Sequence, residues 1–124
     1  MYVLDSSAII EILYNSKKGE KIVQAIKEED IASTTICKVE VLIGAKGKAE
    51  NYAKDIFRKM YVFEFTKDAA ERSIEMGKEL LKEGKPLEGP DLFIAGICKE
   101  QNLPLITCDK SFKNIKGIKV MYIE

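Results

Sequence analysis

Short apolar runs alternate with amphipathic helical segments along this chain of 124 residues, and this alternation constrains its fold most strongly. The apolar runs are residues 2–4, 30–34, 61–65, 105–107 and 119–123. Apolar residues recur at the spacing of a helix in residues 8–13, 18–28, 36–45, 49–60, 66–83 and a segment that begins near residue 90. Strands that alternate with helices pair in parallel, and helices then cover both sheet faces. The chain is therefore predicted to form one α/β domain, residues 1–124, as a three-layer α/β/α sandwich with about five parallel strands.

The composition restricts the available chemistry. The chain has no histidine, which excludes Ser-His-Asp and Cys-His catalysis and the usual imidazole metal sites. The scattered Cys37, Cys98 and Cys108 are predicted to be reduced core residues. No apolar run approaches membrane-spanning length and no signal segment precedes the first strand, so we expect a cytoplasmic protein without membrane contact. Catalysis must come from carboxylates, hydroxyls and lysines, and hard oxygen ligands favour Mg²⁺ or Mn²⁺.

Two carboxylates directly follow predicted strands. Asp5 ends the first strand and precedes Ser6 and Ser7, and Asp109 follows the strand that ends at Thr107. In open α/β sheets, functional groups collect beyond the carboxyl ends of the strands. Each acid taken singly is better explained as a helix cap or turn residue. If the acids act together, the neighbouring hydroxyls are placed to orient them or a metal-bound water.

Two further carboxylates are predicted to face the interior from helices. Glu40 shares a helical face with Ile36 and Ile43, where a charge is costly unless it is paired or bound to metal. Asp91 lies in the first turn of a helix, where the helix dipole favours an acid, but on a face with apolar residues. Clustered carboxylates raise one another's pKa, and cations would neutralise them. The four predicted site acids are Asp5, Glu40, Asp91 and Asp109.

The segments that carry these acids resemble the PIN-domain ribonucleases, especially the VapC-type toxins of prokaryotic toxin–antitoxin pairs. The matching blocks are Val3-Leu4-Asp5-Ser6-Ser7, Thr34-Thr35 with Val39-Glu40-Val41-Leu42-Ile43-Gly44, Pro90-Asp91-Leu92-Phe93-Ile94-Ala95, and Leu103-Pro104-Leu105-Ile106-Thr107-Cys108-Asp109-Lys110-Ser111-Phe112. No single block is specific, but four blocks in order over the full length are.

The resemblance implies a sheet with strand order 3-2-1-4-5 and cleavage of RNA that depends on Mg²⁺ or Mn²⁺. It implies that the four acids are both catalytic and metal-binding, with Ser6, Ser7 and Thr107 in supporting positions. It also implies three partners: an RNA substrate, a second copy in a homodimer, and a cognate antitoxin. The antitoxin's tail would cover the site and place an arginine or lysine near the acids.

Basic side chains gather beside the predicted site although the formal net charge is zero. Segment 38–59 carries six basic residues against three acids, and four lysines follow Asp109 before the next acid, Glu124. Basic stretches next to an acidic site are typical of a nuclease rim, although each single lysine is equally well explained as an ordinary solvated charge.

Two other functions remain open. A non-catalytic PIN-like module for RNA binding or assembly would hold RNA and leave it intact. A phosphoryl-transfer domain of the receiver or haloacid-dehalogenase kind needs further acids at the first strand and a site lysine, whereas Asp5 is followed by Ser6 and Ser7.

Overall fold

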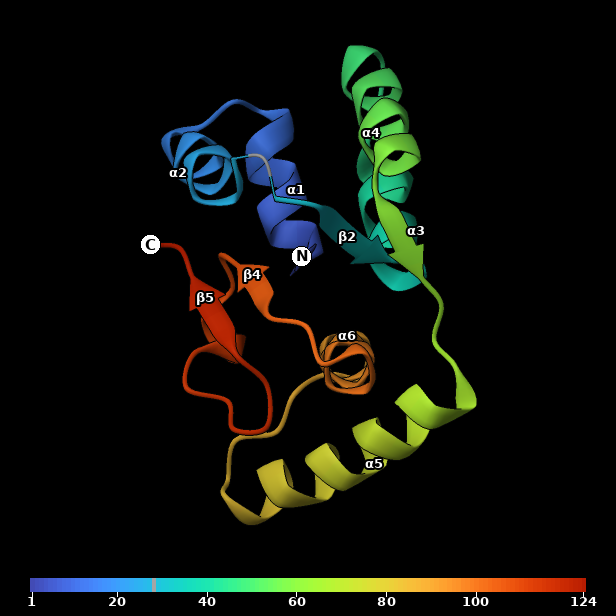
Figure 1. Ribbon diagram of the computed structural model, residues 1–124, viewed down its shortest axis with the longest axis vertical. Coiled ribbons are helices and arrows are strands. Elements are labelled where there is room, and N and C mark those ends of the chain that lie inside the picture. The colour runs from blue at the N-terminus through green and yellow to red at the C-terminus, as the bar shows by residue number, and fades with distance from the viewer. Residues whose placement is uncertain (28) are drawn as a thin grey trace.

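The computed structural model describes residues 1–27 and 29–124 (Figure 1). Its strands are β1 (Tyr2–Leu4), β2 (Ile31–Thr34), β3 (Tyr61–Phe63), β4 (Leu105–Thr107) and β5 (Val120–Tyr122). Its helices are α1 (Ser6–Leu13), α2 (Lys17–Ile26), α3 (Thr35–Gly44), α4 (Lys48–Lys59), α5 (Lys67–Lys82), α6 (Gly89–Gln101) and the short 3-10 helix η1 (Lys110–Phe112). Each predicted segment is present with small shifts at its ends. Glu28, the last residue of the predicted helix 18–28, lies outside the described residues.

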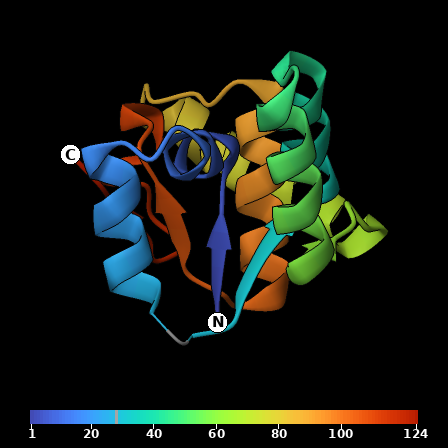
Figure 2. The same cartoon turned by 90° about the horizontal axis from the view of Figure 1, so that it is seen from above.

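The strands form one parallel sheet in the order β3-β2-β1-β4-β5, which confirms the predicted fold class and topology. In Figure 2 the central strand β1 runs from the N-terminus directly into α1. Because the strands are parallel, their carboxyl ends share one edge, and the residues that follow β1 and β4 become neighbours there.

Two hydrophobic cores cover the two faces of the sheet. Successive strand residues point to opposite faces, so Leu4 packs in one core while Val3 packs in the other. The first core lies under α1, α2 and α4, and the second lies against α5 and α6 (Figure 1). This arrangement is the predicted three-layer sandwich.

Close packing between α5 and α6 fixes the position of the helix that carries Asp91. A Cβ atom at Gly96 would lie 1.9 Å from Ser73 Oγ and 2.7 Å from the carbonyl oxygen of Ala69. Only glycine lets the two helices approach this closely. The Ser73 hydroxyl donates a hydrogen bond of 2.9 Å to the same carbonyl of Ala69.

Side chains cap the N-termini of α1 and α3, two helices that begin at the carboxyl edge of the sheet. Asp5 caps α1 by accepting from the Ala8 amide at 3.0 Å, and Thr34 caps α3 by accepting from the Cys37 amide at 3.0 Å. The N-cap of α3 is Thr34 rather than Thr35, which is the first residue of the helix. An N-cap residue needs extended backbone, which Thr34 has with φ −129° and ψ 160°.

The cysteines are all free thiols, as predicted, and two of them are fully buried. Cys37 and Cys98 belong to the core against α5 and α6, while Cys108 is half-buried. No helix in the described ranges combines the length and apolar character that crossing a membrane requires.

Candidate active site

Asp5 lies at the centre of the carboxyl edge and is only 3% exposed. Its carboxylate accepts hydrogen bonds from Ser7 Oγ (2.7 Å) and the Ala8 amide (3.0 Å) at Oδ1, and from Thr107 Oγ1 (2.5 Å) at Oδ2. Burial raises the pKa of Asp5 above its ordinary value, and the nearby charge of Asp109 acts in the same direction. The three hydrogen bonds oppose this rise because they stabilise the ionised carboxylate.

The hydroxyls of Ser7 and Thr107 connect Asp5 to the segment that follows β4. Ser7 Oγ accepts from the Cys108 amide at 2.9 Å, and Thr107 Oγ1 accepts from the Asp109 amide at 2.9 Å. Each hydroxyl donates its single hydrogen to Asp5 and accepts a hydrogen from a backbone amide, so both the donor and an acceptor position of each hydroxyl are used. The side chains predicted to support the site therefore hold β1, α1 and the β4 loop together.

Asp91 shows most directly that the predicted acids share one region. It is half-buried in the first turn of α6, and its pKa is raised to about 6. Burial is the largest cause, followed by the negative charges of Asp109, Glu40, Asp5 and Glu88. Such repulsion weakens steeply with distance in a solvated protein, so these carboxylates form one cluster.

Glu40 is exposed, and the prediction that it points into the core was wrong. Helix α3 buries the face of Cys37 and Val41, whereas Ile43, which shares a face with Glu40, is 82% exposed. Because α3 is apolar on several sides, residue spacing alone did not identify its core face. Glu40 nevertheless reaches the site, where its Oε1 accepts a 2.6 Å hydrogen bond from Ser6 Oγ.

Asp109 is half-buried at the start of η1, which it caps. Its Oδ1 accepts from both the amide (2.8 Å) and the hydroxyl (2.6 Å) of Ser111. The alternative explanation of Asp109 as a cap residue is thus correct, and it does not conflict with a place in the acid cluster.

A fifth acid, Glu88, precedes the first turn of α6 and acts on Asp91, and it is not among the four predicted site acids. Its position three residues before Asp91, at the predicted start of a helix, was the available signal. Glu88 is exposed, so nothing in the apolar pattern distinguished it from an ordinary surface charge.

The oxygen donors of the cluster suit a hard divalent cation such as Mg²⁺ or Mn²⁺. Across residues 1–27 and 29–124, however, no three acidic or cysteine side chains lie close enough together to hold a metal ion. Glu40 and Asp109 are instead bonded to Ser6 and Ser111. The donor set therefore fits a cation by its chemistry, and shared coordination requires some of these side chains to rotate.

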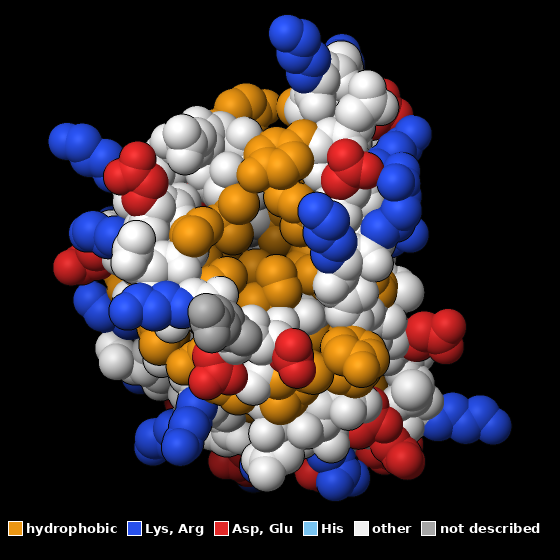
Figure 3. All heavy atoms as spheres, turned by 45° about the horizontal axis from the view of Figure 1, so that its top comes forward, with side chains coloured by type: hydrophobic (Ala, Val, Ile, Leu, Met, Phe, Trp, Pro, Cys, Tyr) orange, Lys and Arg blue, Asp and Glu red, His pale blue; other side chains and the backbone are white. Residues whose placement is uncertain are grey.

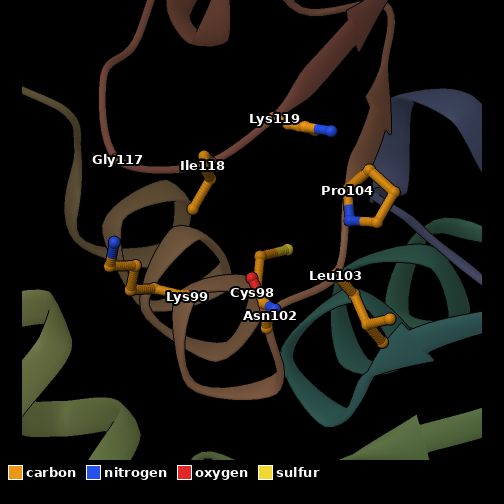
Figure 4. Close-up of a pocket in the computed structure, with 8 residues that line it drawn as sticks. All are labelled: Cys98, Lys99, Asn102, Leu103, Pro104, Gly117, Ile118 and Lys119. Atoms are coloured by element: carbon orange, nitrogen blue, oxygen red, sulfur yellow. The ribbon is translucent and has the colours of Figure 1, made fainter.

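A separate cavity of about 430 Å³ lies at the opposite edge of the sheet (Figure 4). It lies between the end of α6 and the segment before β5, with Lys99 and Lys119 on different sides. All eight residues that line it are neutral or lysine, so this cavity lacks the carboxylates of the candidate site.

The fold and the acid cluster together define an α/β protein with a carboxylate site beyond the ends of its parallel strands. The family model of the PIN domain matches residues 2–118, and the chain belongs to this family. Family membership removes the receiver and dehalogenase alternative. A comparison with curated protein sequences finds no match.

Solved structures of toxin–antitoxin proteins are similar to this chain in fold. VapBC2 from Rickettsia felis, bound to a DNA fragment from its promoter, has a TM-score of 0.80 and 21% identity, with 99% of this chain and 98% of that chain covered. A toxin–antitoxin complex from Klebsiella pneumoniae gives 0.81 and 24%, covering 98% and 96%. VapC20 from Mycobacterium tuberculosis, a toxin that cleaves the sarcin–ricin loop, gives 0.72 and 14%, covering 97% and 98%.

The raised pKa of Asp91 predicts a pH-dependent effect of Asp91→Asn on stability in the absence of metal. Between pH 3.8 and about 6 the folded state holds a proton that the unfolded state releases, so wild-type stability falls as pH rises through this range. Above it, removing the charge should stabilise the protein by on the order of 1 kcal/mol, since solvent screens a half-buried group. The gain should disappear below about pH 4. Urea unfolding in EDTA across this range measures it.

Asp68→Asn is the matched control, because Asp68 is also a first-turn acid but is exposed on α5. It should lose up to about 0.5 kcal/mol through the helix dipole at neutral pH. If Asp91→Asn loses stability in the same way, Asp91 acts as a helix-capping charge and not as a member of a repelling cluster.

Proposed function

We propose that this chain is a metal-dependent endoribonuclease that hydrolyses RNA phosphodiester bonds, and that it is the toxin of a VapBC-type toxin–antitoxin pair. The observation that carries the proposal is the convergence of four carboxylates at the carboxyl edge of the sheet: Asp5 and Asp109 follow the paired strands β1 and β4, Asp91 lies in the first turn of α6, and Glu40 accepts a hydrogen bond from Ser6. Membership of the PIN family and similarity to the M. tuberculosis toxin that cleaves the sarcin–ricin loop support it.

In this proposal Asp5, Glu40, Asp91 and Asp109 would hold Mg²⁺ or Mn²⁺, and the cation would supply Lewis-acid chemistry that activates water and offsets charge on the phosphate. Ser7 and Thr107 keep the Asp5 carboxylate in one orientation. Ser6 holds Glu40 beside the start of α1.

A non-catalytic RNA-binding or assembly module is the second candidate. The observation in its favour is that no three side chains of the described residues form a ready metal site. Cleavage of mixed structured RNAs in Mn²⁺, Mg²⁺ or EDTA separates the two functions. A nuclease cuts RNA only with metal, whereas a binding module retains intact RNA in Mn²⁺.

Each of the substitutions Asp5→Asn, Glu40→Gln, Asp91→Asn and Asp109→Asn should reduce RNA cleavage at least about 100-fold, because even outer-shell changes at metal sites cost about 10–100-fold. The folds should remain intact by circular dichroism. Mn²⁺ should also raise the melting temperature of the wild type more than that of each variant, since a cation binds the folded state preferentially.

Glu64→Gln is the control, because Glu64 is exposed beyond β3. It should cleave RNA and respond to Mn²⁺ like the wild type. Glu11→Gln is a closer control, because Glu11 lies within electrostatic reach of Cys108 beside the cluster. If Glu11→Gln were as damaging as Asp5→Asn, the set of site acids would be wrong.

We also propose that a cognate antitoxin binds the apolar hollow between α1, α2 and α4. Figure 3 shows hydrophobic side chains gathered on the floor and rim of this hollow. Tyr14, Val23 and Tyr52, from α1, α2 and α4, are 68%, 48% and 48% exposed, so large apolar groups remain open to a partner. Helix α1 links this surface to the acids, because it begins at Ser6. The similar structures of toxin–antitoxin complexes support such a partner.

Tyr14→Glu should release cleavage from inhibition by the cognate antitoxin, because the substitution places a charge in the apolar hollow. The measurement is RNA cleavage by each purified toxin with increasing antitoxin. Cleavage without antitoxin should be unchanged. Equal inhibition of wild type and variant would move the antitoxin to another surface.

We further propose a homodimer that uses the outer apolar face of α5 and α6. Ile74 and Leu81, two turns apart on α5, are 50% and 69% exposed, and they line an apolar cavity of about 360 Å³ together with Phe65 and Phe93. The two phenylalanine rings are 4.8 Å apart. A continuous apolar face of this kind is typical of an interface between copies.

Leu81→Glu should shift the protein from dimer to monomer at micromolar concentration, measured by analytical ultracentrifugation, because a charge would be buried at the interface. Tyr14→Glu, on the other apolar surface, should remain dimeric and serves as the control. A wild type that sediments as a monomer would exclude the dimer.

A further inference from the structure

The edge strand β5 places an aromatic side chain next to the acid cluster. Tyr122 is paired with Thr107 in the parallel register, and the Ile123 amide donates a 2.9 Å hydrogen bond to the Thr107 carbonyl. Paired residues of neighbouring strands point to the same face of a sheet. Tyr122 is therefore one strand away from the hydroxyl that holds Asp5.

Two lysines from different elements join Tyr122 around a hollow of about 490 Å³. Lys113, which follows η1, places its Nζ over the Tyr122 ring at 5.4 Å from the centroid. Lys21 lines the hollow from α2, and its Nζ donates a 3.2 Å hydrogen bond to the carbonyl oxygen of Glu124. The hollow therefore carries positive charge from two elements, α2 and the segment after η1, against a single acid in its lining, Glu124.

The local charge balance favours this side of the molecule for binding a polyanion. In the predicted basic segment 38–59, Lys54 and Arg58 are paired with Glu50 and Asp55 at 3.4 and 2.9 Å, which reduces their attraction for phosphate. Among the described residues, no carboxylate lies within ion-pair distance of Lys113. A site of clustered carboxylates repels RNA, so neighbouring cations are needed to bring the strand in.

We propose that this hollow binds the RNA strand on one side of the phosphate to be cleaved. Lys113 and Lys21 contact backbone phosphates, and Tyr122 is a positioning residue that holds Lys113 through a cation–π contact. The inference rests on the proposed ribonuclease function, and it specifies the path of the substrate. The partner is RNA rather than an acidic protein because two contacts connect the hollow to the acids. Lys113 follows the short helix η1 that Asp109 caps, and Tyr122 is paired with Thr107, whose hydroxyl donates to Asp5.

Binding of a fluorescent single-stranded RNA of mixed sequence, measured by anisotropy in EDTA at several salt concentrations, tests the phosphate contacts. Lys113→Ala and Lys21→Ala should each weaken binding and lower the slope of log K against log salt by about 0.7, the value for one phosphate contact on a single strand. Lys67→Ala is the matched control. Lys67 is the first residue of α5 and follows Thr66, whose hydroxyl donates a hydrogen bond to Glu100 near the end of α6. Asp91 lies in the first turn of α6, so Lys67 is at the far end of that helix from the acids.

Substitutions of Tyr122 test its positioning role. Tyr122→Phe keeps the ring and should bind RNA like the wild type, whereas Tyr122→Leu should lose part of the affinity that Lys113 supplies. In a Lys113→Ala background, Tyr122→Leu should have no additional effect, because the group that it positions is absent. An equal loss in both backgrounds would show that Tyr122 does not act through Lys113.

Cleavage of a dinucleotide and of a long RNA in Mn²⁺ separates this inference from the proposed function. A dinucleotide has only the phosphate that is cleaved and no further backbone phosphate for Lys21 or Lys113 to contact. The lysine variants should therefore cleave it like the wild type and should show a raised KM only for long RNA. Variants that bind and cleave long RNA normally overturn the substrate path while the nuclease function stands. A wild type that binds RNA with the expected slopes but never cleaves it overturns the nuclease function and leaves the binding surface supported. Lysine variants that lose only antitoxin binding overturn the inference in favour of a protein partner.

Discussion

The hydrogen bonds to the buried carboxylate of Asp5 are the interaction on which the site depends. An ionised carboxylate that is 3% exposed is costly unless donors compensate for the lost water. Ser7, Thr107 and the Ala8 amide supply them, and they come from α1 and β4. The same contacts begin α1 and join two neighbouring strands at their carboxyl ends. Capping and site-building are therefore one interaction here, and the structural and functional explanations of Asp5 do not compete.

Asp91, in contrast, works against the stability of the fold. Repulsion and burial raise the pKa of Asp91 to about 6, so its charged form is disfavoured in the folded protein. A fold retains such a cost where the charge serves a function. The two cores on either face of the sheet provide the compensating stability, and Gly96 allows α6 to pack closely enough on α5 to keep Asp91 in place.

The surfaces around the acid edge differ in chemistry, and each is suited to a different kind of partner. The hollow between α1, α2 and α4 and the outer face of α5 and α6 are apolar, which suits protein partners. The hollow at β5 carries Lys21 and Lys113 and suits a polyanion. The three surfaces use different residues, although α2 contributes Val23 to the apolar hollow and Lys21 to the hollow at β5, so a single small domain can present all three.

The sequence by itself determined the layer architecture, because the alternation of strand and helix periods leaves few ways to bury the apolar faces. It also placed Asp5 and Asp109 at the carboxyl edge of the sheet, because residues that directly follow parallel strands lie at that edge. The inward direction assigned to Glu40 was wrong, because α3 is apolar on several sides and only packing selected the face of Cys37 and Val41. Glu88 and the pairing of Lys113 with Tyr122 depend on helix packing and strand register, which bring together residues far apart in the chain. Local patterns fix what each segment can form, but only the tertiary structure decided which side chains meet.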